Sequence, residues 1–189
     1  MKELRLFEIR DKALESGRSV YSTQQLASLI KKPKAQTTVY VKRLIDKKMA
    51  VKVRKGTIAF ENDEAIIASQ LIEPSYISLQ TALLFQGIIQ QVTKDIECVT
   101  TRNSFNLKKL GIKYHKIPSK LFNNYKKIQK GKSYIMLAEP EKALFDGLYL
   151  NIFNKKDLME LKQKINQKKL KELIEIQGSN KLKKMIKND

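Results

Sequence analysis

The chain has 189 residues, of which 42% are hydrophobic, so it can form one domain or a small domain followed by a medium one. Lysine and arginine total 38 against 19 acidic residues, which gives a formal net charge of +19. No apolar run approaches the length of a membrane span, and the charged amphipathic N-terminus does not resemble a secretory signal. The single cysteine, Cys98, excludes a disulfide framework and a cysteine zinc site. We therefore expect a cytoplasmic protein.

The positive charge is concentrated toward the N-terminus. Residues 1–60 carry 15 basic and 5 acidic side chains, whereas residues 61–154 carry 12 and 9. Such an imbalance favours binding to a polyanion such as nucleic acid. The alternative is a lysine-rich background in which lysine serves mainly to keep the surface soluble. The pattern of the first 60 residues favours the first interpretation.

The N-terminal third predicts a compact series of short elements. A helix over residues 3–15 is followed by an extended piece over 19–21. Ser22 and Gln25 have capping-box spacing and predict the start of a second helix. Residues 31–34 form a turn, in which Pro33 suits the start of a third helix over 34–48. A β-hairpin over 51–60 follows, with Gly56 at its tip.

The third helix has one apolar and one polar face. Thr37, Val41, Leu44 and Ile45 recur at helical spacing and predict the buried stripe, while the opposite face is polar and basic apart from Val39. A short strand, two helices joined by a tight turn, and then a hairpin indicate a winged helix-turn-helix. In such a module the second of the two joined helices enters the DNA major groove.

The predicted DNA contacts follow from this geometry. Forked amide and guanidinium groups match adenine and guanine edges, and lysines near helix ends or on the wing suit phosphates. The candidate DNA-binding residues are Lys31, Lys34, Gln36, Thr38, Tyr40, Lys42, Arg43, Lys47, Arg54 and Lys55. For each of them the alternative is a solvated surface side chain. For the whole module the alternative is a winged helix that binds protein.

The remainder predicts a second, mixed α/β domain. Residues 1–62 form the first domain, 63–74 a connector with a short helix over 64–71, and 75–189 the second domain. Within it we expect a helix over 79–86 capped by Ser78, strands over 95–101, 112–117 and 133–137, and a helix over 141–150 opened by Pro140. Asn154 is expected to cap a further helix. The fold class is α+β.

Few residues of the second domain suggest catalysis. His115 is the only histidine and is best read as a surface or packing residue, while Cys98 lies in an apolar strand and is best read as a core residue. The seven glycines are scattered and form no phosphate-binding loop. A metal-dependent nuclease could be built only by bringing together carboxylates such as Asp95, Glu97 and Glu141. We predict no catalytic residue, no metal and no cofactor.

Two segments of the second domain are similar to a known family. They are Tyr76–Leu83 (YISLQTAL), with Gly87 and DIECVTT after it, and Ala138–Asp146 (AEPEKALFD), followed by Leu148-Tyr149-Leu150. Downstream of a winged helix they resemble the AbiEi-type antitoxins, predicted transcriptional regulators of viral-defence systems of toxin–antitoxin type IV. The resemblance extends to about residue 150, and this chain is short for the family.

The resemblance implies two activities and no enzyme. The first domain would bind an inverted repeat in its own promoter and repress its operon, with two copies on the DNA. The second domain would act as antitoxin against a nucleotidyltransferase-like toxin encoded next to it. The alternative is a winged-helix regulator that is controlled by a ligand or by dimerisation and has no toxin partner.

Overall fold

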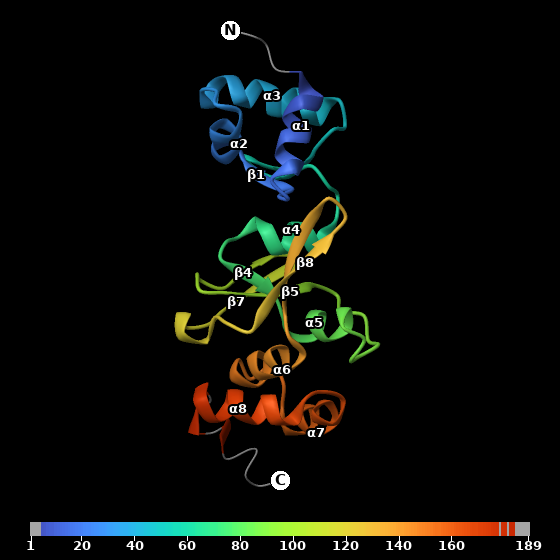
Figure 1. Cartoon of the computed structure of the whole chain (residues 1–189), viewed down its shortest axis with the longest axis vertical. Coiled ribbons are helices and arrows are strands. Elements are labelled where there is room, and N and C mark those ends of the chain that lie inside the picture. Colours follow the sequence, from blue (N-terminus) through green and yellow to red (C-terminus); the bar gives the residue numbers. More distant parts are fainter. Residues whose placement is uncertain (1–4, 178, 181, 184–189) are drawn as a thin grey trace. The chain divides into compact units, whose positions relative to one another are not determined.

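A computed structural model describes residues 5–177, 179–180 and 182–183 and has a mixed α+β fold with two sheets (Figure 1). The chain divides into two compact units. The first runs to Glu73 and also contains Ile128–Ile135, while the second contains Pro74–Lys127 and the described residues from Met136 onward. Residues 3 and 4 of the predicted first helix lie outside the described residues.

The first unit contains four helices and a three-stranded antiparallel sheet of order β1-β3-β2 among its described residues. The elements are α1 (Leu6–Glu15), β1 (Val20–Ser22), α2 (Thr23–Ile30), α3 (Lys34–Asp46), β2 (Val51–Arg54), β3 (Thr57–Ala59) and α4 (Glu64–Leu71). Val20 and Val51 flank Ala59 on the central strand.

The start of α2 follows from its local sequence. The N–H of Gln25 donates to Ser22 Oγ (3.1 Å), and the N–H of Ser22 donates to Gln25 Oε1 (2.8 Å). This confirms the predicted capping box, in which two helix-end donors are satisfied reciprocally. Pro33 directly precedes α3, where its missing N–H costs nothing.

The core of the first unit lies between α1, α2, α3 and the sheet. Ile9, Leu26, Leu44 and Ile58 are buried at its centre. In α3 the predicted stripe is only partly correct: Thr37 and Leu44 are buried, whereas Val41 and Ile45 are half-buried at the edge of this core.

Gln70 connects three segments of the first unit. Its Oε1 accepts from the N–H groups of Ser19 (2.9 Å) and Val20 (3.1 Å), and its Nε2 donates to Ser133 Oγ (2.9 Å) and the Tyr134 carbonyl (2.8 Å). The side chain is buried, and four polar groups depend on it. Helix α4, expected to lie in a connector, is thus part of the first unit.

The turn over residues 128–135, which the sequence placed in the second domain, has further partners in the first unit. Lys130 Nζ lies 2.6 Å from Asp63 Oδ2, and the N–H of Lys132 donates to Glu61 Oε1 (3.2 Å). Gly131 has φ +59°, and a Cβ there would come within 2.8 Å of Glu61 Oε1. The backbone conformation favours glycine at this position, and any larger residue would also displace the Glu61 carboxylate.

A six-stranded mixed sheet of order β6-β7-β5-β4-β9-β8 organises the second unit. Its strands are β4 (Ser75–Ile77), β5 (Ile96–Thr100), β6 (Phe105–Leu107), β7 (Ile112–Lys116), β8 (Tyr125–Lys130) and β9 (Ser133–Ala138). Strand β4 pairs antiparallel with β5 and parallel with β9, and β5 pairs parallel with β7. The far ends of β8 and β9, with the turn between them, belong to the first unit.

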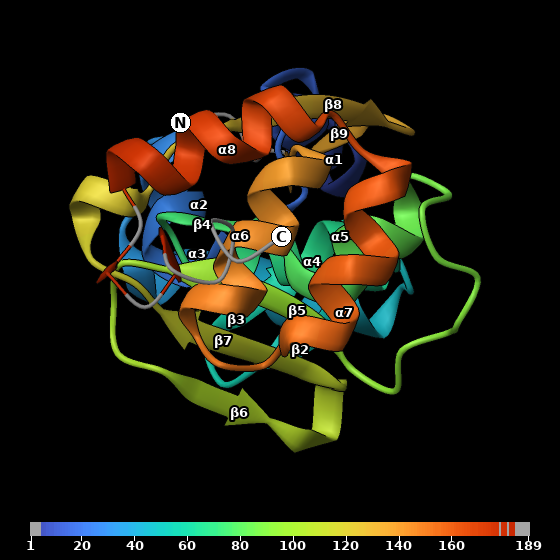
Figure 2. The same ribbon diagram turned by 90° about the horizontal axis from the view of Figure 1, so that it is seen from below.

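Helices of the second unit are stacked in layers on this sheet. They are α5 (Leu79–Phe85), α6 (Pro140–Tyr149), α7 (Lys155–Leu161) and α8 (Gln167–Gln177). Helix α6 lies between the sheet and the outer pair α7 and α8 (Figure 1), and the view from below shows α7 and α8 on either side of it (Figure 2). Asn154 caps α7 as predicted, since its Oδ1 accepts from the N–H groups of Lys156 (2.8 Å) and Asp157 (3.2 Å).

Three strands, β4, β6 and β8, were not predicted. Strands β4 and β6 have three residues each, too few to show an alternating pattern. Strand β8 is the last strand in the sheet order and reads YKKIQK, a polar composition suited to an edge. Across the described residues, every helix is too short or too polar to cross a bilayer.

Candidate nucleic-acid interface

The exposed face of α3 carries most of the predicted contacts. Lys34, Gln36, Thr38, Lys42 and Arg43 are all solvent-exposed. Thr38 Oγ1 donates to the Lys34 carbonyl (2.9 Å), so part of its hydrogen-bonding capacity is used within the helix. The basic side chains on this face can approach a polyanion without being drawn out of a core.

Tyr40 lies differently from the other candidates. It is half-buried and packs against the hydrophobic core of the first unit. Its position one turn before Leu44 explains this, because residues four apart share a helix face. Tyr40 therefore supports α3 from the inner side rather than standing on the exposed face.

Val39 and Ala35 form the middle of the exposed face and were not among the predicted contacts. Val39 is 52% exposed, and Ala35, one turn before it, is also exposed. Both lie about half a turn from the buried Thr37 and Leu44. The same periodicity that identified the buried stripe could have identified them.

The turns beside α3 present the remaining lysines. Lys31 is exposed at the end of α2 and has left-handed backbone angles (φ +52°), with its N–H bonded to the Ser28 carbonyl (3.3 Å). Lys47 is exposed just after α3. A lysine in a conformation that favours glycine costs some stability.

The β2–β3 hairpin presents Arg54 and Lys55 near its tip, and both are exposed. Gly56 occupies the turn with φ +73°. The N–H of Thr23, at the start of α2, donates to the Gly56 carbonyl (2.8 Å). This bond holds the backbone of the hairpin tip against the start of α2, so that Arg54 and Lys55 project from a fixed turn.

The second unit contains a buried polar cluster formed by Tyr76, Ser78, Lys142 and Asp146. Lys142 Nζ lies 2.5 Å from Asp146 Oδ1, and Asp146 Oδ2 accepts from Tyr76 Oη (2.9 Å) and Ser78 Oγ (2.8 Å). Ser78 was predicted to cap α5, but its hydroxyl is used here and makes no cap bond. Leu79, directly after it, has a left-handed backbone (φ +56°) at the turn from β4 into α5.

Burial governs the protonation of this cluster. It raises the pKa of Asp146 and lowers the pKa of Lys142, because a charge is poorly solvated in the interior. Burial, and then the neighbouring Asp146 carboxyl, raise the pKa of Tyr76, so its hydroxyl remains a donor. All four residues come from the two segments YISLQTAL and AEPEKALFD, which the fold brings together. The four side chains satisfy one another's hydrogen bonds inside the second unit.

Each carboxylate considered for a nuclease site has another partner. Asp95 pairs with Lys113 (2.6 Å) and Glu97 with His115 (3.3 Å). Glu141 Oε1 accepts from the N–H of Asn166 (3.0 Å). Among the residues that the structure describes, no group of three histidine, cysteine, aspartate or glutamate side chains could hold a metal ion.

Cys98 is fully buried, which confirms it as a core residue, and burial raises its pKa. A thiol of this kind is protonated and inaccessible, and therefore a poor nucleophile.

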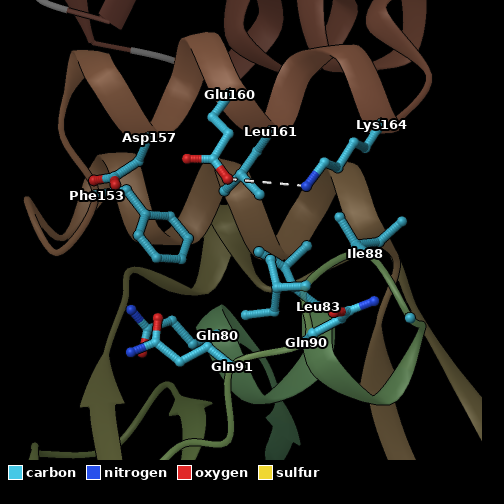
Figure 3. A pocket seen from close by; sticks show the side chains of 12 residues that line it. Gln80, Leu83, Ile88, Gln90, Gln91, Phe153, Asp157, Glu160, Leu161 and Lys164 are labelled. Atoms are coloured by element: carbon cyan, nitrogen blue, oxygen red, sulfur yellow. Dashed lines mark ion pairs between the residues drawn. The ribbon is translucent and has the colours of Figure 1, made fainter.

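A cavity of about 590 Å³ lies between α5, the loop that follows it, and α7 (Figure 3). Its lining mixes polar and apolar side chains: Gln80, Gln90 and Gln91 lie on one side and Asp157, Glu160 and Lys164 on the other (Figure 3). The lining residues are Gln80, Leu83, Gly87, Ile88, Ile89, Gln90, Gln91, Phe153, Asp157, Glu160, Leu161 and Lys164. Glu160 and Lys164 form a loose ion pair (3.9 Å) on the α7 side. The volume is in the range of small-molecule sites.

No family model matches this chain, and no curated protein matches it.

Proposed function

We propose that the first unit is a winged helix-turn-helix that binds double-stranded DNA, with α3 as its recognition helix and β2–β3 as its wing. The element order α1-β1-α2-α3-β2-β3 is the order of that module. The chain acts in the cytoplasm as a transcriptional repressor of its own operon. The observation that carries this proposal is the exposed face of α3, which presents Lys34, Lys42 and Arg43 with Asp46 as the helix's sole acid.

Charge and geometry support binding at this face in particular. Residues 1–60 hold +10 of the formal net charge of +19. Lys31 lies in the turn between α2 and α3, Lys47 lies just after α3, and Arg54 and Lys55 lie on the wing, where backbone contacts position such a module. An inverted repeat requires two copies of the chain on one DNA site.

The test is the double substitution Lys42→Ala with Arg43→Ala. Contacts to base edges are worth about 1–3 kcal/mol each, so binding to the duplex upstream of the gene should weaken roughly a hundredfold. Fluorescence anisotropy at several salt concentrations measures the affinity, and the salt dependence should become shallower for each phosphate contact that is lost.

The matched control is Lys168→Ala with Lys171→Ala on α8. These lysines are also exposed, and their removal changes the net charge equally. The control should bind DNA almost as well as the wild-type chain. An equal loss of DNA affinity in both variants would show that only total charge matters and would reject α3 as the interface.

The antitoxin role is proposed from the resemblance of the second unit to AbiEi-type antitoxins. A nucleotidyltransferase-like toxin encoded by the adjacent gene would be its functional partner. Co-expression with that gene tests the role: the chain should restore growth, and the Lys42→Ala, Arg43→Ala variant should still restore it from a heterologous promoter. Failure of the wild-type chain to restore growth would reject the role.

A ligand-controlled regulator without a toxin is the second candidate. The cavity of about 590 Å³ in the second unit favours it, because this volume lies in the range of small-molecule sites. This candidate predicts a compound that raises the melting temperature and changes the DNA affinity. The absence of a nucleotidyltransferase gene next door would also favour it.

A further inference from the structure

The middle of the exposed α3 face is apolar, although basic and polar side chains surround it. Val39 is 52% exposed, and exposed Ala35 lies one turn before it on the same side. Lys42 and Arg43 follow in the next turn, and Gln36 is adjacent. Single exposed apolar side chains are common on protein surfaces. What distinguishes Val39 is its place, since it stands with Ala35 in the middle of the face that the proposed function turns toward DNA.

A recognition helix places its N-terminal half against base edges. In the major groove, the thymine 5-methyl group is the apolar feature that identifies a base, and small apolar side chains contact it. Ala35 leaves room for close approach of the helix, and Val39 presents two methyl groups from a stiff β-branched side chain.

We propose that Val39, with Ala35 beside it, recognises the methyl group of a thymine in the major groove and so helps to set the DNA sequence that this chain binds. This inference rests on the proposed DNA-binding function. It makes Val39 a specificity determinant, whereas Lys42 and Arg43 supply charge and polar contacts.

The experiment begins with duplexes that the full-length chain selects from a random-sequence library. Each thymine of the selected site is then replaced by uracil, which keeps the base-pair hydrogen bonds and removes one methyl group. For wild-type protein, replacement at the contacted position should raise Kd about fourfold, the value expected for losing one buried methyl-sized group. The same replacement should have no effect on Val39→Ala, because the contact is already missing.

Two further measurements separate this contact from electrostatics and from misfolding. Val39→Ala should leave the salt dependence of binding unchanged, since an apolar contact releases no counterions. Alanine has a higher helix propensity than valine, so the variant is expected to fold. The matched control is Val92→Ala, at a valine that is 82% exposed in the second unit, and it should bind as the wild type does.

The outcomes are distinguishable. If the wild-type chain binds the selected duplexes but responds to no uracil replacement, thymine recognition is rejected and DNA binding stands. If Val39→Ala shows the same uracil penalty as the wild type, Val39 is not the contact. If the chain neither selects nor binds any duplex, the proposed function fails and the inference fails with it.

Discussion

The pair Lys142 and Asp146 shows at the scale of single residues how much an interior position depends on its partners. Both side chains are 0% exposed, and Tyr76 and Ser78 donate hydrogen bonds to the same carboxyl group. Removing one member of a buried pair leaves the other charge without compensation, at a cost of about 3–5 kcal/mol. We therefore expect substitutions at these four residues to lower stability, whatever their effect on binding.

Lys142→Met tests this with a predicted pH dependence. Burial raises the pKa of Asp146, so without the ammonium the folded variant keeps this proton at pH values where the unfolded chain has released it. Stability should then fall as pH rises above about 4, by about 1.4 kcal/mol per pH unit, until the folded-state pKa is passed. Urea denaturation at a series of pH values above about 4 measures the free energy of unfolding of the variant.

The double variant Lys142→Met with Asp146→Asn is the control, because it removes the titrating group. Its stability should lack the additional pH dependence. An equally steep dependence in both variants would assign the effect to another group.

At the scale of elements, the turns that end α2 and α3 each contain a lysine with left-handed backbone angles. Lys31 ends α2 with left-handed backbone angles, and Lys48 does the same after α3 (φ +55°). Glycine adopts this conformation without strain, so lysine at these sites is costly for the turn itself.

Lys31→Gly should raise the free energy of unfolding by about 0.5–1 kcal/mol. It should also weaken DNA binding and make its salt dependence shallower by about one phosphate contact. Lys48→Gly is the matched variant, expected to stabilise similarly while leaving DNA affinity nearly unchanged. Chemical denaturation and anisotropy measure the two effects. Two variants that bind DNA equally well would remove Lys31 from the interface.

At the scale of the whole molecule, the first unit is assembled from segments that are distant in the sequence. Gln70 joins α4 to β1 and to the start of β9 through four hydrogen bonds, and a single buried amide serves them all. Residues 128–135 are therefore needed to complete a unit whose other residues end at Glu73.

Gln70→Leu should destabilise the first unit by on the order of 2–4 kcal/mol, because the N–H groups of Ser19 and Val20 remain buried without their acceptor. Hydrogen exchange should accelerate at the amides of Ser19 and Val20. Gln24→Leu, at an exposed glutamine of α2, is the control and should change neither quantity. Unchanged exchange at both amides in Gln70→Leu would contradict this role.

The sequence by itself determined those features that depend on neighbours within about one helical turn. The Ser22–Gln25 capping box, the Asn154 cap, the Pro140 helix start and the exposure of Lys42 and Arg43 are all of this kind. Each is set by spacings of three or four residues, which are legible in the chain.

Only the tertiary structure decided which distant groups meet. Ser78 bonds to Asp146, 68 residues away, instead of capping α5, and Gln70 reaches Tyr134 across 64 residues. Strands β4 and β6 are too short to show a pattern and acquire their hydrogen bonds from neighbouring strands. Such pairs depend on the path of the chain through space, and no local spacing encodes that path.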